Sequence, residues 1–255
     1  MSRLIIFLKF GGDFGFCPRG GGVWEESARA SFRIFWRAGY STTRVKTGII
    51  NSIENKNNIK VIAFDFGGVI YNYSHNVLMK DVAKELKQPV IAVTNAWKTK
   101  INEYELGQVT ENEFWNAFLS KLKINHNKKT LHRVVIHHFY PIVESLKILK
   151  SLKGKVILCL ISNQTTWLDD LEKKYKFKIF FDIIIISDKV ALRKPSKEIF
   201  NLFIEKAKVK SNKIIFVDDF LKYKEPTESV GINFIHFKNS RELKIKLKKY
   251  GVQIK

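Results

Sequence analysis

The sequence contains little cysteine and no apolar stretch long enough to cross a bilayer. Two cysteines occur in 255 residues, and Cys17 and Cys159 are too far apart for a zinc-site spacing or a disulfide framework. The apolar run at residues 180–187 ends well short of the roughly 20 residues that a membrane span needs. The apolar run at residues 4–8 is too short for a secretory signal. We therefore expect a protein of the reducing cytoplasm with no membrane association.

Acidic residues are scarce relative to basic ones. The chain has 45 Lys and Arg against 24 Asp and Glu, a formal net charge of +21. Clustered basic side chains neutralise nucleic-acid phosphates, so a nucleic-acid partner is one interpretation. Most lysines, however, alternate with apolar positions of expected helices, as in residues 240–249. This pattern favours a lysine-rich solvated surface over a nucleic-acid-binding face.

The first 58 residues differ in composition from the rest. Six of the nine arginines and eight of the fourteen glycines lie in the first 50 residues, and the polar run at residues 51–58 is typical of a linker. We expect residues 1–58 to be a non-catalytic basic extension and linker, or upstream sequence included by a misplaced start. Loss of folding or activity on deleting them would contradict this expectation.

From residue 59 onward, short apolar segments rich in β-branched residues alternate with amphipathic helices. The expected strands lie at residues 59–64, 155–161, 181–186, 213–217 and 232–237. Right-handed crossovers between successive strands would place them in one mostly parallel sheet with helices on both faces. The sequence therefore predicts a doubly wound, Rossmann-like α/β fold.

A helical segment interrupts this alternation between residues 74 and 140. Its clearest helix begins at Thr110, which forms a capping-box pattern with Glu113. Aromatic residues follow at helical spacing and are expected to pack in a core. The segment's histidines have no metal-ligand spacing and are expected to be structural or exposed. Elsewhere, Thr165 or Thr166 and Ser240 are expected to cap the helices that follow them.

Polar residues follow several of the expected strands. Asp65 follows the first, Ser162 the second, and Asp218 and Asp219 the fourth, while Lys194 lies in the loop after the third. Because parallel strands end at one edge of a sheet, we expect these side chains to converge. The carboxylates suit Mg²⁺, and the lysine and serine suit a phosphate oxygen. An aspartate beside such a cation can attack phosphorus and form an acyl-phosphate.

Four motifs in this order resemble those of the haloacid dehalogenase superfamily, whose members are mostly Mg²⁺-dependent phosphatases. The motifs are Phe64-Asp65-Phe66-Gly67-Gly68-Val69, Ile161-Ser162-Asn163, Arg193-Lys194-Pro195 and Phe216-Val217-Asp218-Asp219. The resemblance covers about residues 59–250. It implies an α/β core at residues 59–73 and 141–255, with a helical cap at residues 74–140. The segment around residues 105–115 looks like the cap of the sugar-phosphatase-like branch.

The resemblance also implies a role for each motif residue that carries chemistry. Asp65 is expected to be the nucleophile and a metal ligand, together with the backbone carbonyl of Gly67. Asp218 and Asp219 would complete the Mg²⁺ site.

The remaining motif residues are expected to bind the phosphoryl group. Ser162 and Lys194 would hold it directly and take part in catalysis. Asn163 and Gly68 would assist at the same position. The expected partner is therefore a small phosphorylated substrate.

The sequence departs from the commonest pattern of this superfamily at Gly67. Most of its phosphatases carry a second aspartate there, which acts as general acid and base, and such assistance is typically worth ~10²–10⁴-fold in rate. Some members that resemble glucose-1-phosphate phosphatases also carry glycine. Ala191 and Tyr223 replace a common Gly and a common Asn or Asp, respectively.

Three functions are consistent with these residues. The first is a phosphatase of a small phosphorylated metabolite such as a sugar phosphate, acting through an aspartyl-phosphate. The second is a 2-haloacid dehalogenase, which needs no cation and is disfavoured by the paired acidic residues 218 and 219. The third is a slow or inactive phosphate- or nucleic-acid-binding protein, motivated by Gly67 and the net charge.

Overall fold

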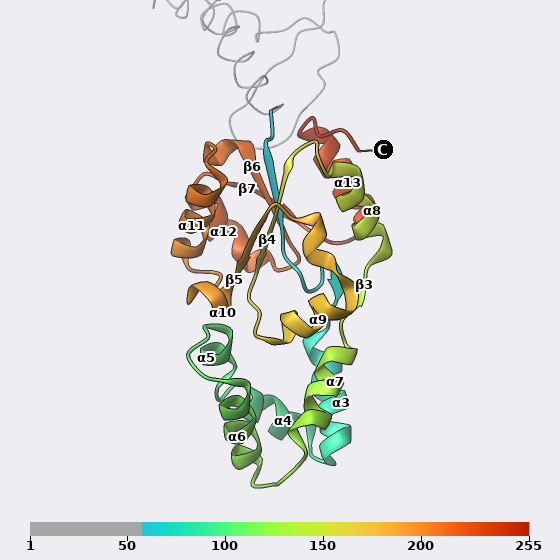
Figure 1. Ribbon diagram of the computed structural model, residues 1–255, viewed down its shortest axis with the longest axis vertical. Helices are drawn as coiled ribbons and strands as arrows, with labels where there is room; N and C mark the ends of the chain where they lie inside the picture. Colours follow the sequence, from blue (N-terminus) through green and yellow to red (C-terminus); the bar gives the residue numbers. More distant parts are fainter. Residues whose placement is uncertain (1–57, 255) are drawn as a thin grey trace, which may run out of the picture. The chain divides into compact units, whose positions relative to one another are not determined.

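The computed structural model describes residues 58–254 (Figure 1). The chain divides into a unit over Met1–Ser52 and a unit over Ile53–Lys255, and the described residues belong to the second. The predicted extension at residues 1–58 lies outside the described residues, apart from Asn58. No helix in this range is long and apolar enough to cross a membrane.

A five-stranded parallel sheet forms the centre of the second unit. Its order is β5-β4-β1-β6-β7, and every neighbouring pair is parallel. The strands are β1 (Val61–Phe64), β4 (Ile157–Ser162), β5 (Ile183–Ile186), β6 (Ile214–Asp218) and β7 (Asn233–His236). β1 is central and fully buried. This arrangement confirms the predicted mostly parallel α/β sheet, and places the ends of β1, β4 and β6 side by side.

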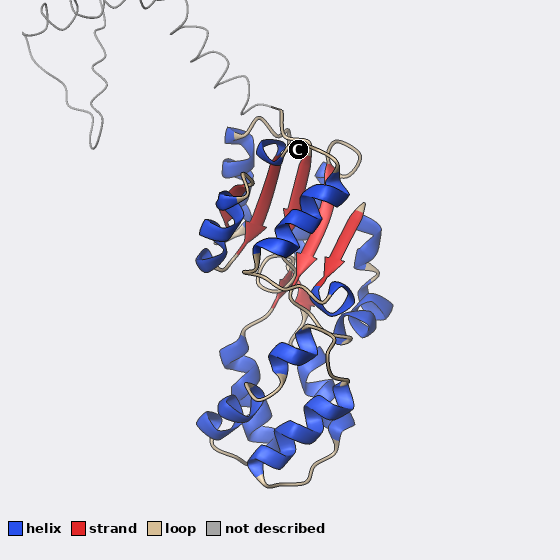
Figure 2. Cartoon of the chain, turned by 90° about the vertical axis from the view of Figure 1, so that its left-hand side faces the viewer, coloured by secondary structure: helices blue, strands red, loops and turns tan. Residues whose placement is uncertain are grey.

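Helices cover both faces of the sheet, and alternate strand residues point to opposite faces (Figures 1 and 2). Ile62 and Phe64 of β1 belong to one apolar cluster, with residues of α8 (Val143–Leu152), α9 (Trp167–Tyr175) and α13 (Ser240–Lys249). Val61 and Ala63 belong to the other, with residues of α11 (Lys197–Ala207). The remaining short elements are η1 (Phe177–Phe180), α10 (Ser187–Val190), η2 (Ser211–Lys213), η3 (Leu221–Tyr223) and α12 (Lys224–Ser229).

Five helices between residues 75 and 137 form what we call the helical insert. They are α3 (His75–Leu86), α4 (Val90–Trp97), α5 (Ile101–Glu105), α6 (Glu111–Leu122) and α7 (Lys128–His137). At its base, β2 (Tyr71–Asn72) pairs antiparallel with β3 (Tyr140–Pro141). Figure 2 shows the insert beyond the carboxyl ends of the sheet strands. The capping box of α6 is formed as predicted.

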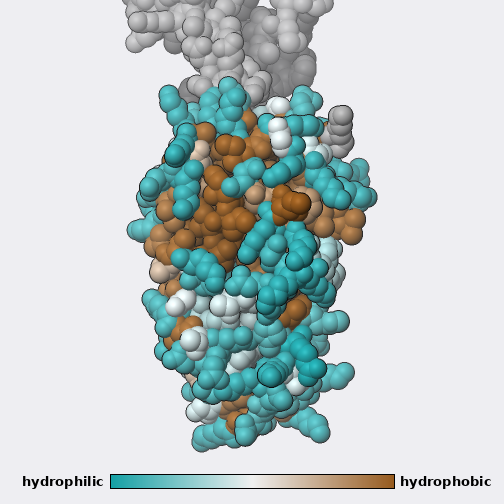
Figure 3. Space-filling view, in the orientation of Figure 1, coloured by the Kyte–Doolittle hydropathy of each residue, from teal (hydrophilic) through white to brown (hydrophobic). Residues whose placement is uncertain are grey.

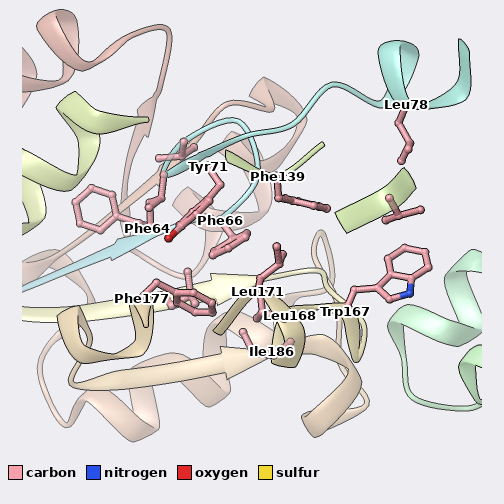
Figure 4. Close-up of a cluster of buried hydrophobic side chains, with 14 of the residues drawn as sticks. Phe64, Phe66, Tyr71, Leu78, Phe139, Trp167, Leu168, Leu171, Phe177 and Ile186 are labelled. Atoms are coloured by element: carbon pink, nitrogen blue, oxygen red, sulfur yellow. The ribbon is translucent and has the colours of Figure 1, made fainter. Parts of the chain in front are cut away.

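The insert has an aromatic core that extends to the sheet domain. Its aromatic rings include those of Trp97 and Phe114, whose centroids are 5.2 Å apart. Trp167 of α9 packs against both, at 5.7 and 5.8 Å. Figure 4 shows Trp167 at one side of a buried cluster that also contains Phe66 and Tyr71. In the view of Figure 3, the insert surface is mostly hydrophilic, whereas hydrophobic surface gathers over the sheet domain.

One predicted helix cap differs from the structure, and another is made by one of its two candidate threonines. Asn239, not Ser240, caps α13, and its side chain accepts a hydrogen bond from the Glu242 N–H. Ser240 is instead buried against Ser145, with 3.1 Å between their hydroxyl oxygens. Before α9, Thr166 occupies the capping position without a side-chain cap, while the Thr165 hydroxyl accepts from the Trp167 N–H at 3.3 Å. At α13, the cap thus lies one residue before the predicted position, and Ser240 is a packing residue instead.

An ionic contact at His132 joins the insert to the sheet domain. His132 of α7 places Nδ1 2.7 Å from Glu111 Oε1 and Nε2 3.3 Å from Asp170 Oδ2, and Asp170 belongs to α9. Trp167 Nε1 donates to the same Glu111 oxygen at 2.8 Å. The hydrogen bond that His132 donates to Glu111, aided by the charge of Asp170, raises the pKa of His132 above its ordinary value, although burial opposes the shift. Both ring nitrogens therefore act as donors when the imidazole is protonated.

We expect His132 to make stability depend on pH. A pKa raised in the folded state contributes stability that is complete below the unfolded value near 6.5 and is lost as pH rises through the folded pKa. As pH rises above the ordinary histidine value of about 6.5, the urea midpoint of the wild type should therefore fall more than that of His132→Gln. His137→Gln, an exposed position on the same helix, is the control. Identical pH dependence in wild type and His132→Gln would contradict this role.

Candidate active site

The structure brings the predicted polar residues together at the carboxyl edge of the sheet. Asp65 directly follows β1, while Ser162 and Asp218 are the last residues of β4 and β6. The Ser162 hydroxyl donates to Asp65 Oδ1 at 2.9 Å. Lys194 Nζ lies 2.8 Å from Asp65 Oδ1 and 2.6 Å from Asp218 Oδ2. Because the strands are parallel and adjacent, residues distant in sequence share one cluster.

Lys194 is the central cation of this cluster. Its side chain is 2% exposed, and its ammonium lies 4.9 Å from the Tyr223 ring centroid and 5.1 Å from that of Phe216. Burial alone would lower the pKa of Lys194, but the charges of Asp65 and Asp218 outweigh burial and raise it. Lys194 therefore remains protonated and neutralises part of the carboxylate charge.

Asn163 holds the loop that presents Lys194. Its amide nitrogen donates to the Lys194 carbonyl at 2.9 Å, and its Oδ1 accepts from the Lys194 N–H at 2.8 Å. Both the nitrogen and the oxygen of the Asn163 side-chain amide are therefore bonded to the Lys194 backbone. The sequence pattern indicates a phosphate contact through the Asn163 backbone, and the structure adds this positioning contact of the side chain.

Three carboxylates meet in the same cluster. Asp65, Asp218 and Asp219 each offer an oxygen, and these oxygens lie within 4.8 Å of one another. Burial raises the pKa of Asp218 to about 6 despite the neighbouring Lys194. Burial, followed by repulsion from Asp65 and Asp218, raises the pKa of Asp219 to about 7. One ammonium is therefore not enough to compensate two buried carboxyl groups and the partly buried one of Asp219.

The chemistry of this donor set fits a magnesium ion. Asp219 Oδ1 is buried and has no hydrogen-bond partner among residues 58–254. A buried carboxylate oxygen without a partner is costly, and Mg²⁺ binds oxygen ligands of this kind. Asp65, Asp218 and Asp219 could hold the ion, with the neighbouring Gly67 carbonyl as the further ligand indicated by the sequence pattern.

The two glycines after Asp65 allow close approaches of different kinds. Gly68 has φ +78°, and a Cβ there would lie 2.4 Å from Asp219 Oδ2, so only glycine leaves room for this carboxylate. A Cβ at Gly67 would lie 3.3 Å from Tyr73 Cβ. The Tyr73 side chain therefore occupies the space beside the nucleophile candidate.

A cavity of about 420 Å³ opens onto this cluster between the sheet domain and the insert. Asp65, Gly67, Ser162, Asn163 and Lys194 line its base, whereas Gly68 does not line it. The insert contributes further lining residues, which sequence reasoning missed: His75, Lys98, Ile101, Asn102 and Glu105.

Aromatic residues near the site divide into two groups. Tyr73 and Trp97 line the cavity, whereas Tyr71, Tyr104 and Trp115 are buried in the core. Helical spacing identifies the apolar face of a helix, but it does not show which side chains at its end reach a cavity. Polar residues at the end of an otherwise amphipathic helical segment, such as Asn102 and Glu105, are the signal that could have been followed.

The insert contacts the loop before Lys194 through Arg193. Arg193 Nη1 donates to Asn102 Oδ1 at 2.6 Å, and Nη2 lies 2.6 Å from Glu105 Oε2. Nearby, the hydroxyls of Tyr104 and Thr166 are 2.5 Å apart. The residue next to the catalytic lysine candidate is therefore in direct contact with α5.

Comparisons with known proteins agree with this geometry. A family model described as haloacid dehalogenase-like hydrolase matches residues 59–222. Bifunctional epoxide hydrolase 2 of Mus musculus is 31% identical over 81 residues, which cover 29% of this chain and 14% of the mouse protein. A phosphorylated carbohydrates phosphatase of Thermotoga maritima is 26% identical over 116 residues, covering 46% of this chain and 53% of that protein. This chain thus spans about half, or much less, of the length of these relatives.

Solved structures share the fold. A HAD family enzyme, bt-2542 of Bacteroides thetaiotaomicron, in complex with magnesium and inorganic phosphate, superimposes with a TM-score of 0.60 at 20% identity. The match covers 71% of this chain and 94% of that chain. At this identity, the likeness concerns the architecture of sheet and helices.

Proposed function

Since this chain belongs to the haloacid dehalogenase-like hydrolase family, we propose that it is a Mg²⁺-dependent phosphatase of a small phosphorylated metabolite, such as a sugar phosphate. The observation that supports this proposal is the buried Lys194 between Asp65 and Asp218, beside an Asp219 oxygen that has no partner in the described part of the chain. A cation and an unpaired carboxylate in one cluster suit a phosphoryl group held against a metal ion.

In the proposed reaction, Asp65 attacks the phosphorus of the substrate. An Asp65 oxygen forms a bond to phosphorus while the bond to the leaving-group oxygen breaks, which gives an aspartyl-phosphate. Lys194 and the Ser162 hydroxyl hold the phosphoryl oxygens and neutralise charge. Water then displaces Asp65 and releases inorganic phosphate. Mg²⁺ held by Asp65, Asp218, Asp219 and the Gly67 carbonyl would supply Lewis-acid stabilisation of the phosphoryl charge.

The cavity supports a small leaving group. Its volume of about 420 Å³ lies toward the lower end of ligand sites, which range over about 300–1,000 Å³. We assign the role of a cap to residues 74–140 because α4 and α5 close the cavity opposite Lys194. The Thermotoga maritima relative, a phosphatase of phosphorylated carbohydrates, supports the same substrate class.

The alternative functions have less support. A haloacid dehalogenase needs no cation, whereas the buried Asp218 and the partly buried Asp219 lie together with Asp65 in one acidic group. A purely phosphate-binding protein does not require an aspartate accepting hydrogen bonds from both Lys194 and Ser162. The cytoplasmic location remains part of the proposal and is consistent with Cys159, which is a free, buried thiol.

The proposal predicts phosphate release that requires Mg²⁺. We expect the full chain to hydrolyse members of a panel of sugar phosphates and other small phosphomonoesters with Mg²⁺, and to lose this activity with EDTA. Asp65→Asn provides the blank. Halide release from 2-haloacids without Mg²⁺ would favour the dehalogenase. Salt-sensitive RNA binding retained in Asp65→Asn, without hydrolysis of any phosphomonoester, would favour the binding protein.

A further inference from the structure

Residue 67, two positions after Asp65, offers no side chain that could protonate a leaving group. Gly67 has no side chain, and Tyr73 lies next to it. A Cβ added to Gly67 would be 3.3 Å from the Cβ of Tyr73. The Tyr73 ring is fixed by stacking on Phe139, with centroids 4.9 Å apart and planes 13° apart. A proton donor for the reaction must therefore approach from another direction.

Two carboxyl groups line the cavity within the described range, and they belong to Asp65 and Glu105. Glu105 is the last residue of α5, so it reaches the cavity from the insert, while Asp65 lies at the sheet edge. The Glu105 side chain is 20% exposed. Since Asp65 is the proposed nucleophile, Glu105 is the carboxyl group free to exchange a proton with a leaving group.

Four groups face Glu105 from the elements around it. Arg193 contacts it directly, Lys194 and Lys222 of the sheet domain act on it through their charges, and its own charge acts on Tyr73. Burial raises the pKa of Glu105 above its ordinary value, and the three cations reduce this shift without cancelling it. A larger fraction of Glu105 is therefore protonated near neutral pH than of an exposed glutamate. Tyr73, whose pKa is raised by burial, stays protonated.

We propose that Glu105, reaching in from the helical insert, is the general acid and base of this phosphatase. The inference rests on the proposed function of the Asp65 cluster. As the Asp65 oxygen bonds to phosphorus and the leaving-group oxygen departs, the Glu105 proton passes to that oxygen and yields an alcohol. Water then enters from the same side, gives a proton to the Glu105 carboxylate and bonds to phosphorus, while the bond from Asp65 to phosphorus breaks. Both carboxyl groups return to their starting states.

Arg193 acts as a positioning residue for this step. Its guanidinium lies 2.6 Å from both Glu105 Oε2 and Asn102 Oδ1, so the carboxyl group is held against the loop that carries Lys194. The contacts of α5 with Arg193 thus bring Glu105 to the loop that carries Lys194. The competing interpretation is that the Glu105 to Arg193 ion pair only fastens the insert, and the two interpretations predict different dependence on the leaving group.

The test compares two substrates that differ in their need for an acid. Nitrophenyl phosphate releases a stabilised phenolate, whereas glycerol phosphate releases an alkoxide that must be protonated. We expect Glu105→Gln to lower kcat/KM for glycerol phosphate by ~10²–10⁴-fold, and for nitrophenyl phosphate by less than about tenfold. The wild type should lose activity on glycerol phosphate as pH rises through the pKa of Glu105. The activity that remains in Glu105→Gln should not show this loss at high pH.

Two further variants separate catalysis from attachment of the insert. Asn102→Ala removes one of the two contacts of α5 with Arg193 but keeps the Glu105 carboxyl group and its ion pair with Arg193, so any loss should be similar for both substrates. Glu105→Asp keeps a carboxyl group, so its activity on glycerol phosphate should still fall at high pH. This variant provides the test if Glu105→Gln is unstable. Equal losses on both substrates in Glu105→Gln would overturn this inference and leave the phosphatase function standing. A wild type that hydrolyses neither substrate with Mg²⁺ would contradict the function itself.

Discussion

Replacing Asp65 with asparagine is expected to abolish phosphate release without unfolding the chain. The carboxylate is the proposed nucleophile, and an amide oxygen is a far poorer one, so kcat should fall by at least about 10³-fold. The amide has the same shape and its oxygen can still accept from Ser162 and Lys194. Lys194 also keeps its contact with Asp218 at 2.6 Å. The loss should therefore concern chemistry rather than folding.

Rapid acid quenching with a ³²P-labelled substrate provides the direct measurement. The wild type should show label attached to the protein during turnover, and Asp65→Asn should show none. Asp81→Asn is a suitable control, because Asp81 is an aspartate with a 53% exposed side chain that pairs with His138 in the insert. Labelled protein in Asp65→Asn, or retained turnover, would show that another group attacks phosphorus.

The parts of this fold that sequence could predict are those set by local pattern. The strands around Asp65, Ser162 and Asp218 are short, apolar and followed by polar residues, and parallel order alone places their ends at one edge. The capping box at Thr110 is likewise a local feature, and α6 begins there. These elements depend on neighbours in sequence, so the pattern was sufficient.

The other parts depend on contacts between distant segments. The pairing of Tyr71–Asn72 with Tyr140–Pro141 involves two residues in each strand, too few to leave a periodic pattern. The contact of Glu105 with Arg193 joins residues 88 positions apart, and its existence depends on how α5 meets the sheet domain. The insert side of the cavity could therefore not be read from the sequence.

The departures from the commonest family pattern acquire physical explanations in the structure. Ala191 adopts φ +52°, a left-handed conformation that glycine tolerates better, which explains why glycine is frequent there. Tyr223 lies below the Lys194 ammonium and contributes a ring face rather than a metal ligand. At Gly67, a second aspartate would crowd the Tyr73 side chain, because its Cβ would lie 3.3 Å from Tyr73 Cβ. Gly67 changes the chemistry of the site most, because it removes an acid from beside the proposed nucleophile.

Lys194→Met is the substitution for which we expect the largest combined effect on stability and activity. It removes the ammonium between Asp65 and Asp218 and leaves buried carboxyl groups without their cation. Breaking a buried ion pair by removing one partner typically costs about 3–5 kcal/mol, and the pair here involves two carboxylates. Phosphate release should also fall, since no other lysine occupies the base of the cavity among the described lining residues.

Magnesium should partly restore the stability that this substitution removes. A cation that binds the folded state stabilises it by about 2.7 kcal/mol at a concentration of 100 Kd. With Lys194 absent, Asp65, Asp218 and Asp219 would retain more uncompensated charge, so Mg²⁺ should raise the urea midpoint of Lys194→Met more than that of the wild type. Lys153→Met, which removes a 41% exposed lysine paired with Asp182, should change neither the midpoint nor its response to Mg²⁺ by a comparable amount. An unchanged midpoint in Lys194→Met, or equal responses of both proteins to Mg²⁺, would show that Lys194 does not compensate the carboxylates of a metal site.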